Sequence, residues 1–189
     1  MLVYSQCPLC GGKDIQFVFN VKDFTVSNDL FPIFQCANCT CRFTNNIPGE
    51  DEIGAYYKSE DYISHTETAK GIVNTIYHAV RKFTLQKKKN LVHHESGKKN
   101  GCLLDLGSGT GAFLDVMKKA GWLVKGLEPD EGARAIAQNK NVDVSSLHQF
   151  FHLPENSFDV ITMWHVLEHV HTLNEYIEQL KKLLKMFIR

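Results

Sequence analysis

An acidic residue stands immediately before a glycine-rich turn in residues 105–111, which read DLGSGTG. The apolar run ahead of it predicts a buried strand, and the spacing of Phe113, Met117 and Ala120 predicts a helix after it. A glycine turn between a strand and a helix N-terminus lets the backbone approach a ligand where a Cβ atom would collide with it. We therefore expect a ligand-binding loop at the carboxyl end of this strand.

A second acidic residue, Glu128, ends the next apolar run at residues 123–127. It would lie at the carboxyl edge of a neighbouring strand, where a carboxylate can accept hydrogen bonds from both hydroxyls of a ribose. Pro129 and Asp130 then open another predicted helix. The two acidic positions together predict a site for a nucleoside-containing ligand.

The rest of the second half completes an alternating order of strands and helices. Residues 142–144 predict a short edge strand, and residues 158–163 predict a fourth strand. Thr172 and Glu175 form a capping box that begins a further helix. This order predicts an α/β fold with a doubly wound parallel sheet.

A nicotinamide-dependent oxidoreductase is one alternative for this site. Gly107, Gly109 and Ala112 fit the looser dinucleotide-binding fingerprint, and Glu128 would serve that ligand too. The position of an acidic residue just ahead of the first glycine, and the spacing of Gly111, count against it.

Cysteines in the first fifty residues form a separate pattern. The two C-x-x-C pairs are Cys7 with Cys10 and Cys36 with Cys39. Two tight turns that each present two thiolates supply a tetrahedral set of four, which suits a structural zinc site. Chance clustering and a rubredoxin-like iron site are the alternatives, and Cys41 could replace Cys39 as a ligand. The runs at residues 15–21 and 30–34 predict short strands between the pairs.

Changes in composition divide the chain into three parts. Residues 1–46 form the cysteine-containing module, residues 47–100 a helical connecting region, and residues 101–189 the ligand-binding domain. From Gly71 onward, apolar residues recur at the spacing of an amphipathic helix. The lysines at residues 87–89 fit a solvated helix end better than a phosphate contact.

Charge and hydropathy restrict the partners and the compartment. The formal net charge is zero, so no basic footprint of the kind that nucleic-acid binders carry is present. No apolar run approaches the ~20 residues that span a bilayer, and the N-terminus lacks a basic and then apolar leader. We expect a cytoplasmic protein without a membrane partner, in which cysteines are reduced. The oligomeric state stays open.

The chain resembles the class I S-adenosylmethionine-dependent methyltransferases, and in particular bacterial members that carry an N-terminal zinc ribbon. The motifs that carry the resemblance are residues 105–111, Glu128 with Pro129, residues 153–161, residues 164–170 and the four cysteines. It extends over nearly the whole chain. A Rossmann-like sheet, S-adenosylmethionine and zinc are therefore implied.

The resemblance also implies roles for individual residues. Asp105 and the glycine loop would hold the methionine part, Glu128 would bind the ribose, and the segment around Phe150 would flank the adenine. The full set of cofactor-binding residues implied in this way is Asp105, Gly107, Ser108, Gly109, Gly111, Glu128, Pro129 and Phe150. The acidic residue that often stands near the adenine is absent.

His165 and His169 follow the fourth strand and are candidates for a general base. Such a base helps when the methyl acceptor is a hydroxyl or an acidic carbon. A purely structural role, in which the two histidines and Glu168 hydrogen-bond the loop, is the alternative.

Relatives of this type continue into three further strands where this sequence reads MFIR and stops. We therefore expect a truncated form in which C-terminal strands are missing. The expected function is methyl transfer to a small-molecule or sugar acceptor. A truncated, non-catalytic remnant that binds S-adenosylmethionine and zinc, and an RNA methyltransferase, are the other readings.

Overall fold

The computed structural model describes residues 1–57 and 72–186 of the 189-residue chain. Contacts within the chain divide the described residues into two compact units. The first holds residues 1–57 with residues 171–174, and the second holds residues 72–170 with residues 175–186. The three-part division expected from the sequence stays a prediction.

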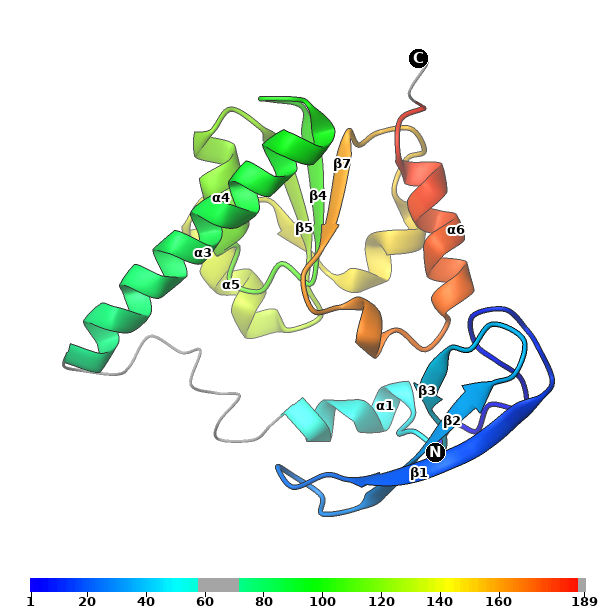
Figure 1. Ribbon diagram of the computed structural model, residues 1–189. Coiled ribbons are helices and arrows are strands. Elements are labelled where there is room, and N and C mark those ends of the chain that lie inside the picture. Colours follow the sequence, from blue (N-terminus) through cyan, green and yellow to red (C-terminus); the bar gives the residue numbers. More distant parts are fainter. Residues whose placement is uncertain (58–71, 187–189) are drawn as a thin grey trace. The chain divides into compact units, whose positions relative to one another are not determined.

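The second unit is built on a parallel sheet of four strands (Figure 1). The strands are β4 (Cys102–Leu106), β5 (Leu123–Leu127), β6 (Val144–Ser145) and β7 (Val160–Met163). Their spatial order is β6-β5-β4-β7, and every neighbouring pair is parallel. The predicted α/β fold with a doubly wound parallel sheet is therefore confirmed.

Helices cover both faces of this sheet (Figure 1). They are α3 (Ile72–Ser96), α4 (Ala112–Lys119), α5 (Glu131–Asn139) and α6 (Leu173–Leu183), with short 3-10 helices η2 (Leu147–His152) and η3 (Leu167–His169). The first three lie on one face, and α6 lies on the other. Successive side chains of β4 alternate between the two faces. Leu103 packs in the core cluster of Phe113 and Met117 from α4, whereas Leu104 packs in the cluster of Leu183 from α6.

Helix α3 differs from its prediction. It continues to Ser96, so the lysines at residues 87–89 lie within the helix and not at a solvated end. Val80 and Phe83, which were expected on its apolar face, are 58% and 61% exposed. The side chains of the earlier apolar residues of this face, up to residue 77, lie outside the described residues.

The first unit contains a three-stranded antiparallel sheet of order β1-β2-β3. Its elements are β1 (Ile15–Lys22), β2 (Leu30–Cys36), β3 (Arg42–Thr44), helix α1 (Glu50–Ile53) and the 3-10 helix η1 (Gly54–Tyr57). Strands β1 and β2 confirm the two predicted strands, and β3 was not predicted. The pairing of β1 with β2 shifts register between Phe17 and Phe19, so that Val18 forms a bulge.

Among the helices within residues 1–57 and 72–186, none combines the length and apolar character that a bilayer crossing requires.

A buried carboxylate joins the beginning of β4 to the segments on either side of the sheet. Asp159 accepts hydrogen bonds from the backbone N–H of Cys102 at 2.8 Å and from the ammonium groups of Lys98 at 2.5 Å and Lys185 at 2.8 Å. Burial alone would raise the pKa of Asp159, but these three donors hold it well below its ordinary value. The carboxylate therefore stays ionised and ties three segments together.

Replacing Asp159 by Asn should lower the free energy of unfolding by about 2 kcal/mol, because two ammonium groups lose their charged acceptor. Because the pKa of Asp159 is lower in the folded than in the unfolded chain, this stabilisation is present above pH about 4 and disappears as the pH falls below it. Urea denaturation at pH 7 and at pH 2 measures both effects. Asp143→Asn, at an exposed ion pair, is the matched control and should change stability by less than about 0.5 kcal/mol. Equal losses in the two variants would contradict the role of Asp159.

Candidate functional site

The glycine loop that follows β4 adopts a left-handed backbone. Gly107, Gly109 and Gly111 have φ angles of +67°, +53° and +69°, a region that glycine enters without strain. A Cβ atom at Gly107 would lie 2.5 Å from Val166 Cγ2, and one at Gly111 would lie 2.9 Å from Ala137 Cβ. A Cβ atom at Gly109 would meet nothing within 4 Å. The first and third glycines are thus required for packing, and the second faces open space that a ligand can approach.

Glu128 lies directly beyond β5 and joins that strand to the glycine loop. Its Oε2 atom accepts a hydrogen bond from the Gly109 N–H at 2.8 Å, and its Oε1 atom accepts one from the Asp130 N–H at 3.0 Å. The side chain is buried, with 9% of its surface exposed. The structure therefore brings the second predicted carboxylate against the backbone of the predicted loop.

The backbone after Glu128 is fixed by the first turn of α5. Arg134 Nη1 donates to the carbonyl oxygens of Glu128 at 2.8 Å and of Pro129 at 2.6 Å. Asp130 caps the helix by accepting a hydrogen bond from the Ala133 N–H at 2.6 Å. Pro129 is exposed and bends the chain from the strand into this helix.

Asp105 is the most buried of the predicted site residues that carry a charge. It is 2% exposed, and its Oδ1 atom accepts a hydrogen bond from Thr162 Oγ1 at 2.6 Å. Burial raises the pKa of Asp105 to about 7, against the opposing effects of the Thr162 hydrogen bond and the Lys88 charge, and the Glu128 charge adds to the rise. Near neutral pH this carboxyl group is therefore poised between its charged and neutral forms.

Lys88 is a residue of this site, although it was predicted to lie at a solvated helix end. Its Nζ atom lies 4.4 Å from the centroid of the Trp164 ring, a cation–π contact, and its charge acts on Asp105. Burial lowers the pKa of Lys88, while the Asp105 charge raises it. Helix α3 therefore brings Lys88 close to Asp105 of β4 and to Trp164, which follows β7.

Two buried polar atoms near the loop have no hydrogen-bond partner among the described residues, Ser108 Oγ and Trp164 Nε1. Such atoms are rare in folded proteins and mark positions where a ligand or an ordered water completes the bonding. Ser108 Oγ is enclosed against Gly126 of β5, and Trp164 Nε1 is likewise enclosed, so the open side of Gly109 is the part of this loop that a ligand can approach.

The two predicted bases lie on the loop after β7. His165 adopts a left-handed backbone with φ +58°, its side chain is 90% exposed, and its Nδ1 atom lies 3.6 Å from Glu168 Oε1. His169 is also exposed and ends the short helix η3. The structure thus places both histidines at the surface beyond the sheet edge, and their catalytic role stays a prediction.

Phe150 is fully buried and belongs to the core cluster on the α6 side of the sheet. Its ring packs on Tyr176 with centroids 4.7 Å apart and on Phe151 with centroids 5.0 Å apart. Phe151 is 50% exposed. Packing therefore accounts for the Phe150 side chain, and a contact of this segment with an adenine ring stays a prediction.

The four predicted metal ligands come together in the first unit. Their Sγ atoms all lie within 4.8 Å of one another, and the Cys7–Cys39 and Cys10–Cys36 sulfur distances are both 3.6 Å. A tetrahedral zinc site with bonds of about 2.3 Å places its sulfurs about 3.8 Å apart, so the arrangement fits zinc.

Two tight backbone turns present these thiols. The Gly11 N–H donates to the Cys7 carbonyl at 2.9 Å, and the Thr40 N–H donates to the Cys36 carbonyl at 3.0 Å. A Cβ atom at Gly12 would lie 3.2 Å from Cys36 Sγ and 3.3 Å from Cys10 Sγ, so glycine leaves room for the cluster.

Cys41 points elsewhere. Its Sγ atom lies 3.5 Å from the Arg42 carbonyl oxygen, and it is not part of the four-sulfur cluster. The geometry favours Cys39 over Cys41 as the fourth ligand.

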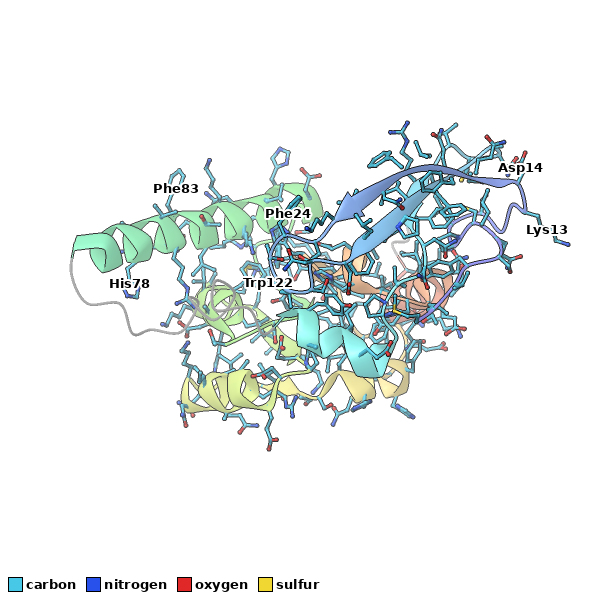
Figure 2. All side chains as sticks on the ribbon, turned by 90° about the horizontal axis from the view of Figure 1, so that it is seen from below. Lys13, Asp14, Phe24, His78, Phe83 and Trp122 are labelled. Atoms are coloured by element: carbon cyan, nitrogen blue, oxygen red, sulfur yellow. The ribbon has the colours of Figure 1, made fainter. Side chains whose placement is uncertain are left out.

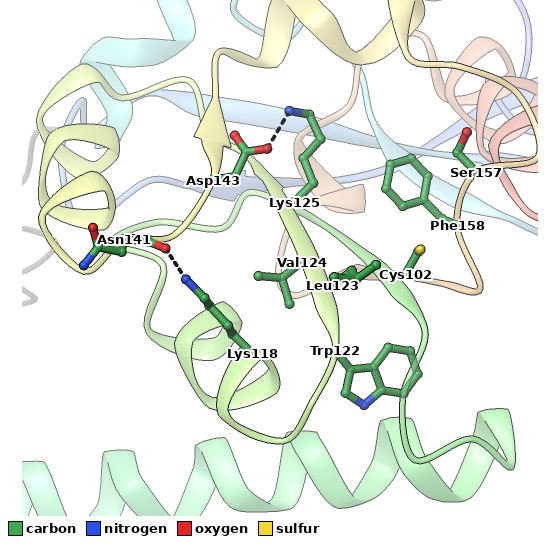
Figure 3. A pocket seen from close by; sticks show the side chains of 10 residues that line it. All are labelled: Cys102, Lys118, Trp122, Leu123, Val124, Lys125, Asn141, Asp143, Ser157 and Phe158. Atoms are coloured by element: carbon green, nitrogen blue, oxygen red, sulfur yellow. Dashed lines mark hydrogen bonds and ion pairs between the residues drawn. The ribbon is translucent and has the colours of Figure 1, made fainter.

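A pocket of about 320 Å³ lies at the opposite, amino edge of the parallel sheet (Figure 3). It is lined by Cys102, Lys118, Trp122, Leu123, Val124, Lys125, Asn141, Asp143, Ser157 and Phe158. Its charged groups already have partners, since Lys125 pairs with Asp143 at 3.1 Å and Lys118 donates to the Asn141 carbonyl at 2.6 Å. The pocket contains no residue of the predicted site.

The chain is similar to several solved structures. The PH0226 protein from Pyrococcus horikoshii is 23% identical with a TM-score of 0.52, and the match covers 67% of this chain and 61% of that one. A SAM-dependent methyltransferase from Aquifex aeolicus is 26% identical with a TM-score of 0.45, covering 51% and 58%. One from Archaeoglobus fulgidus is 22% identical with a TM-score of 0.48, covering 56% and 48%. The chain spans 43% to 63% of the length of the first three solved structures that it matches.

None of the curated proteins matches the chain. A sequence profile of the family described as "Methyltransferase domain" matches residues 78–187, which is more than half of the chain. This span contains the glycine loop, both carboxylates, Trp164 and the part of α3 that carries Lys88. The chain belongs to the methyltransferase domain family.

Proposed function

We propose that this chain is an S-adenosylmethionine-dependent methyltransferase that acts on a small-molecule acceptor. The observation that carries the proposal is the meeting of Asp105, Glu128 and the open side of Gly109 at one edge of the sheet. Membership of the methyltransferase domain family supports it and disfavours the nicotinamide-dependent alternative.

Different residues of the site would contact different parts of S-adenosylmethionine. Glu128 would accept hydrogen bonds from the ribose hydroxyls, and the glycine loop would lie against the methionine part. Asp105 would balance the positive charge of the ligand, and that charge would in turn favour the ionised form of this buried carboxyl group. When bound, S-adenosylmethionine supplies an electrophilic methyl group, and its transfer is a direct displacement. The protein contributes mainly alignment, which can lower the barrier by about 7–11 kcal/mol.

The proposed acceptor is small because the chain has a formal net charge of zero, which gives no attraction for a nucleic-acid backbone. His165 is exposed beyond the sheet edge, where it could take a proton from an acceptor that reaches it.

We further propose that the four-cysteine cluster holds one structural zinc ion. Four thiolates close the coordination shell and leave no position for a reacting water. In a unit of this size the metal contributes much of the folding free energy, about 10–16 kcal/mol in zinc-finger peptides.

Replacing Glu128 by Gln should weaken S-adenosylmethionine binding by about tenfold or more, because a neutral amide replaces a charged acceptor for two hydroxyls. Isothermal titration calorimetry measures the affinity, with NAD and NADP as ligand controls. Glu155→Gln, an exposed residue away from the site, is the matched control and should bind as the wild type does. Binding of NAD in place of S-adenosylmethionine would overturn the proposal.

The affinity for S-adenosylmethionine should rise as the pH increases from about 6 to about 8. A cationic ligand favours the ionised form of Asp105, so binding releases a proton whenever Asp105 is protonated beforehand. Calorimetry in two buffers of different ionisation enthalpy counts that proton. In Asp105→Asn the affinity should be lower and its pH dependence flatter. An unchanged pH dependence in this variant would show that another group titrates.

Cys36→Ser should lose the zinc ion and lower the melting temperature of the first unit, because three thiolates bind the metal less tightly than four. Cys41→Ser should keep one zinc per chain, since Cys41 lies outside the cluster. Elemental analysis by mass spectrometry measures the zinc content of both variants. Loss of zinc in Cys41→Ser with retention in Cys36→Ser would reverse the assignment.

A further inference from the structure

Strand β1 is an exposed edge strand with an apolar composition. Within the described residues it pairs with β2 alone, so its other edge presents unpaired backbone groups. Phe17, Val18, Phe19 and Val21 are 55%, 37%, 45% and 45% exposed. Edge strands that avoid pairing usually carry proline, charged residues or a β-bulge. Strand β1 contains no proline and no charge before Lys22 at its end, and its bulge is confined to Val18. Such a surface is suited to pairing with another strand.

The sequence of β1 and its flanks is nearly symmetric about Val18. Residues 14–22 read DIQFVFNVK. Residues at the same distance before and after Val18 are of the same chemical kind, except at the two ends, where the charges are opposite. The equivalent positions are Phe17 with Phe19, Gln16 with Asn20, Ile15 with Val21 and Asp14 with Lys22.

An antiparallel pair of two identical strands has twofold symmetry. With the axis at Val18, each residue faces the residue that lies equally far on the other side of Val18 in the second copy. Here aromatic would face aromatic, amide would face amide, and Asp14 of one copy would face Lys22 of the other, twice in the pair. Val18 would lie at the axis, and it is the bulged residue that has no register partner on β2. Lys13 and Asp14 stand just before β1, and Phe24, which is 79% exposed, lies beyond its other end (Figure 2).

We propose that β1 docks on β1 of a second copy of this chain, forming a twofold dimer through an antiparallel strand pair. Charge complementarity favours a second copy as the partner, because Asp14 at one end of the strand would face Lys22 of the other copy. Cross-strand pairs of apolar and opposite-charge side chains each stabilise such a pair. The proposal rests on the first unit alone and does not depend on the proposed methyl transfer.

Sedimentation velocity of the zinc-loaded full chain over a concentration series tests the pairing. Lys22→Asp should weaken the dimer about tenfold or more, because two attractive pairs become two repulsive ones. Asp14→Lys should do the same. The double variant, Asp14→Lys with Lys22→Asp, exchanges the charges and should restore the dimer. Lys99→Asp, the same charge change at an exposed position of the second unit, is the matched control and should leave the dimer unchanged.

A dimer weakened by each single change and restored by the double change supports the pairing. A chain that stays monomeric at every concentration overturns it. If the β1 amides of that monomer are protected from hydrogen exchange, the edge of β1 is covered by another segment of the same chain. A dimer that responds equally to all charge changes, or to none, places the interface elsewhere.

Discussion

Burial of β4 on both faces is the constraint on which the candidate site depends. A polar side chain in a strand buried on both faces costs free energy unless it forms hydrogen bonds or ion pairs. Asp105 is the one charged residue within β4. Parallel pairing then brings the carboxyl ends of β5 and β7 to the same edge. Glu128 and Trp164 follow those ends, so the topology of the sheet assembles the site.

The same burial sets the chemistry of Asp105. A carboxyl group with 2% exposure cannot ionise as readily as one in water, which is why its pKa rises to about 7. Thr162 donates to it, and Lys88 lies close enough to offset part of the cost. The ligand-free protein thus holds a carboxyl group that a positively charged ligand would ionise. The burial of Asp105 in the core thus makes its ionisation depend on the binding of a positively charged ligand.

Much of this arrangement follows from local sequence. The apolar runs and the glycine turn predicted β4, β5 and the loop, and the cysteine spacing predicted which sulfurs gather. The contact of Asp105 with Thr162 could not be predicted, because it depends on the register between β4 and β7, which no local pattern determines. Lys88 was assigned to solvent because residues 87–89 resemble a helix end, whereas α3 continues to Ser96. The burial of Phe150 depends on the packing of Tyr176 from a distant helix.

The central claim is that S-adenosylmethionine binds at the carboxyl edge of β4, against Gly109 and Glu128. Titration of the ligand into ¹⁵N-labelled, zinc-loaded protein, followed by nuclear magnetic resonance, tests it most directly. The account predicts saturable shifts at the amides of Gly107, Gly109 and Gly111, with the amides of Gly11 and Gly12 unchanged. Shifts centred on Trp122 and Leu123 at the opposite edge of the sheet, or no shifts in a folded sample, would contradict it.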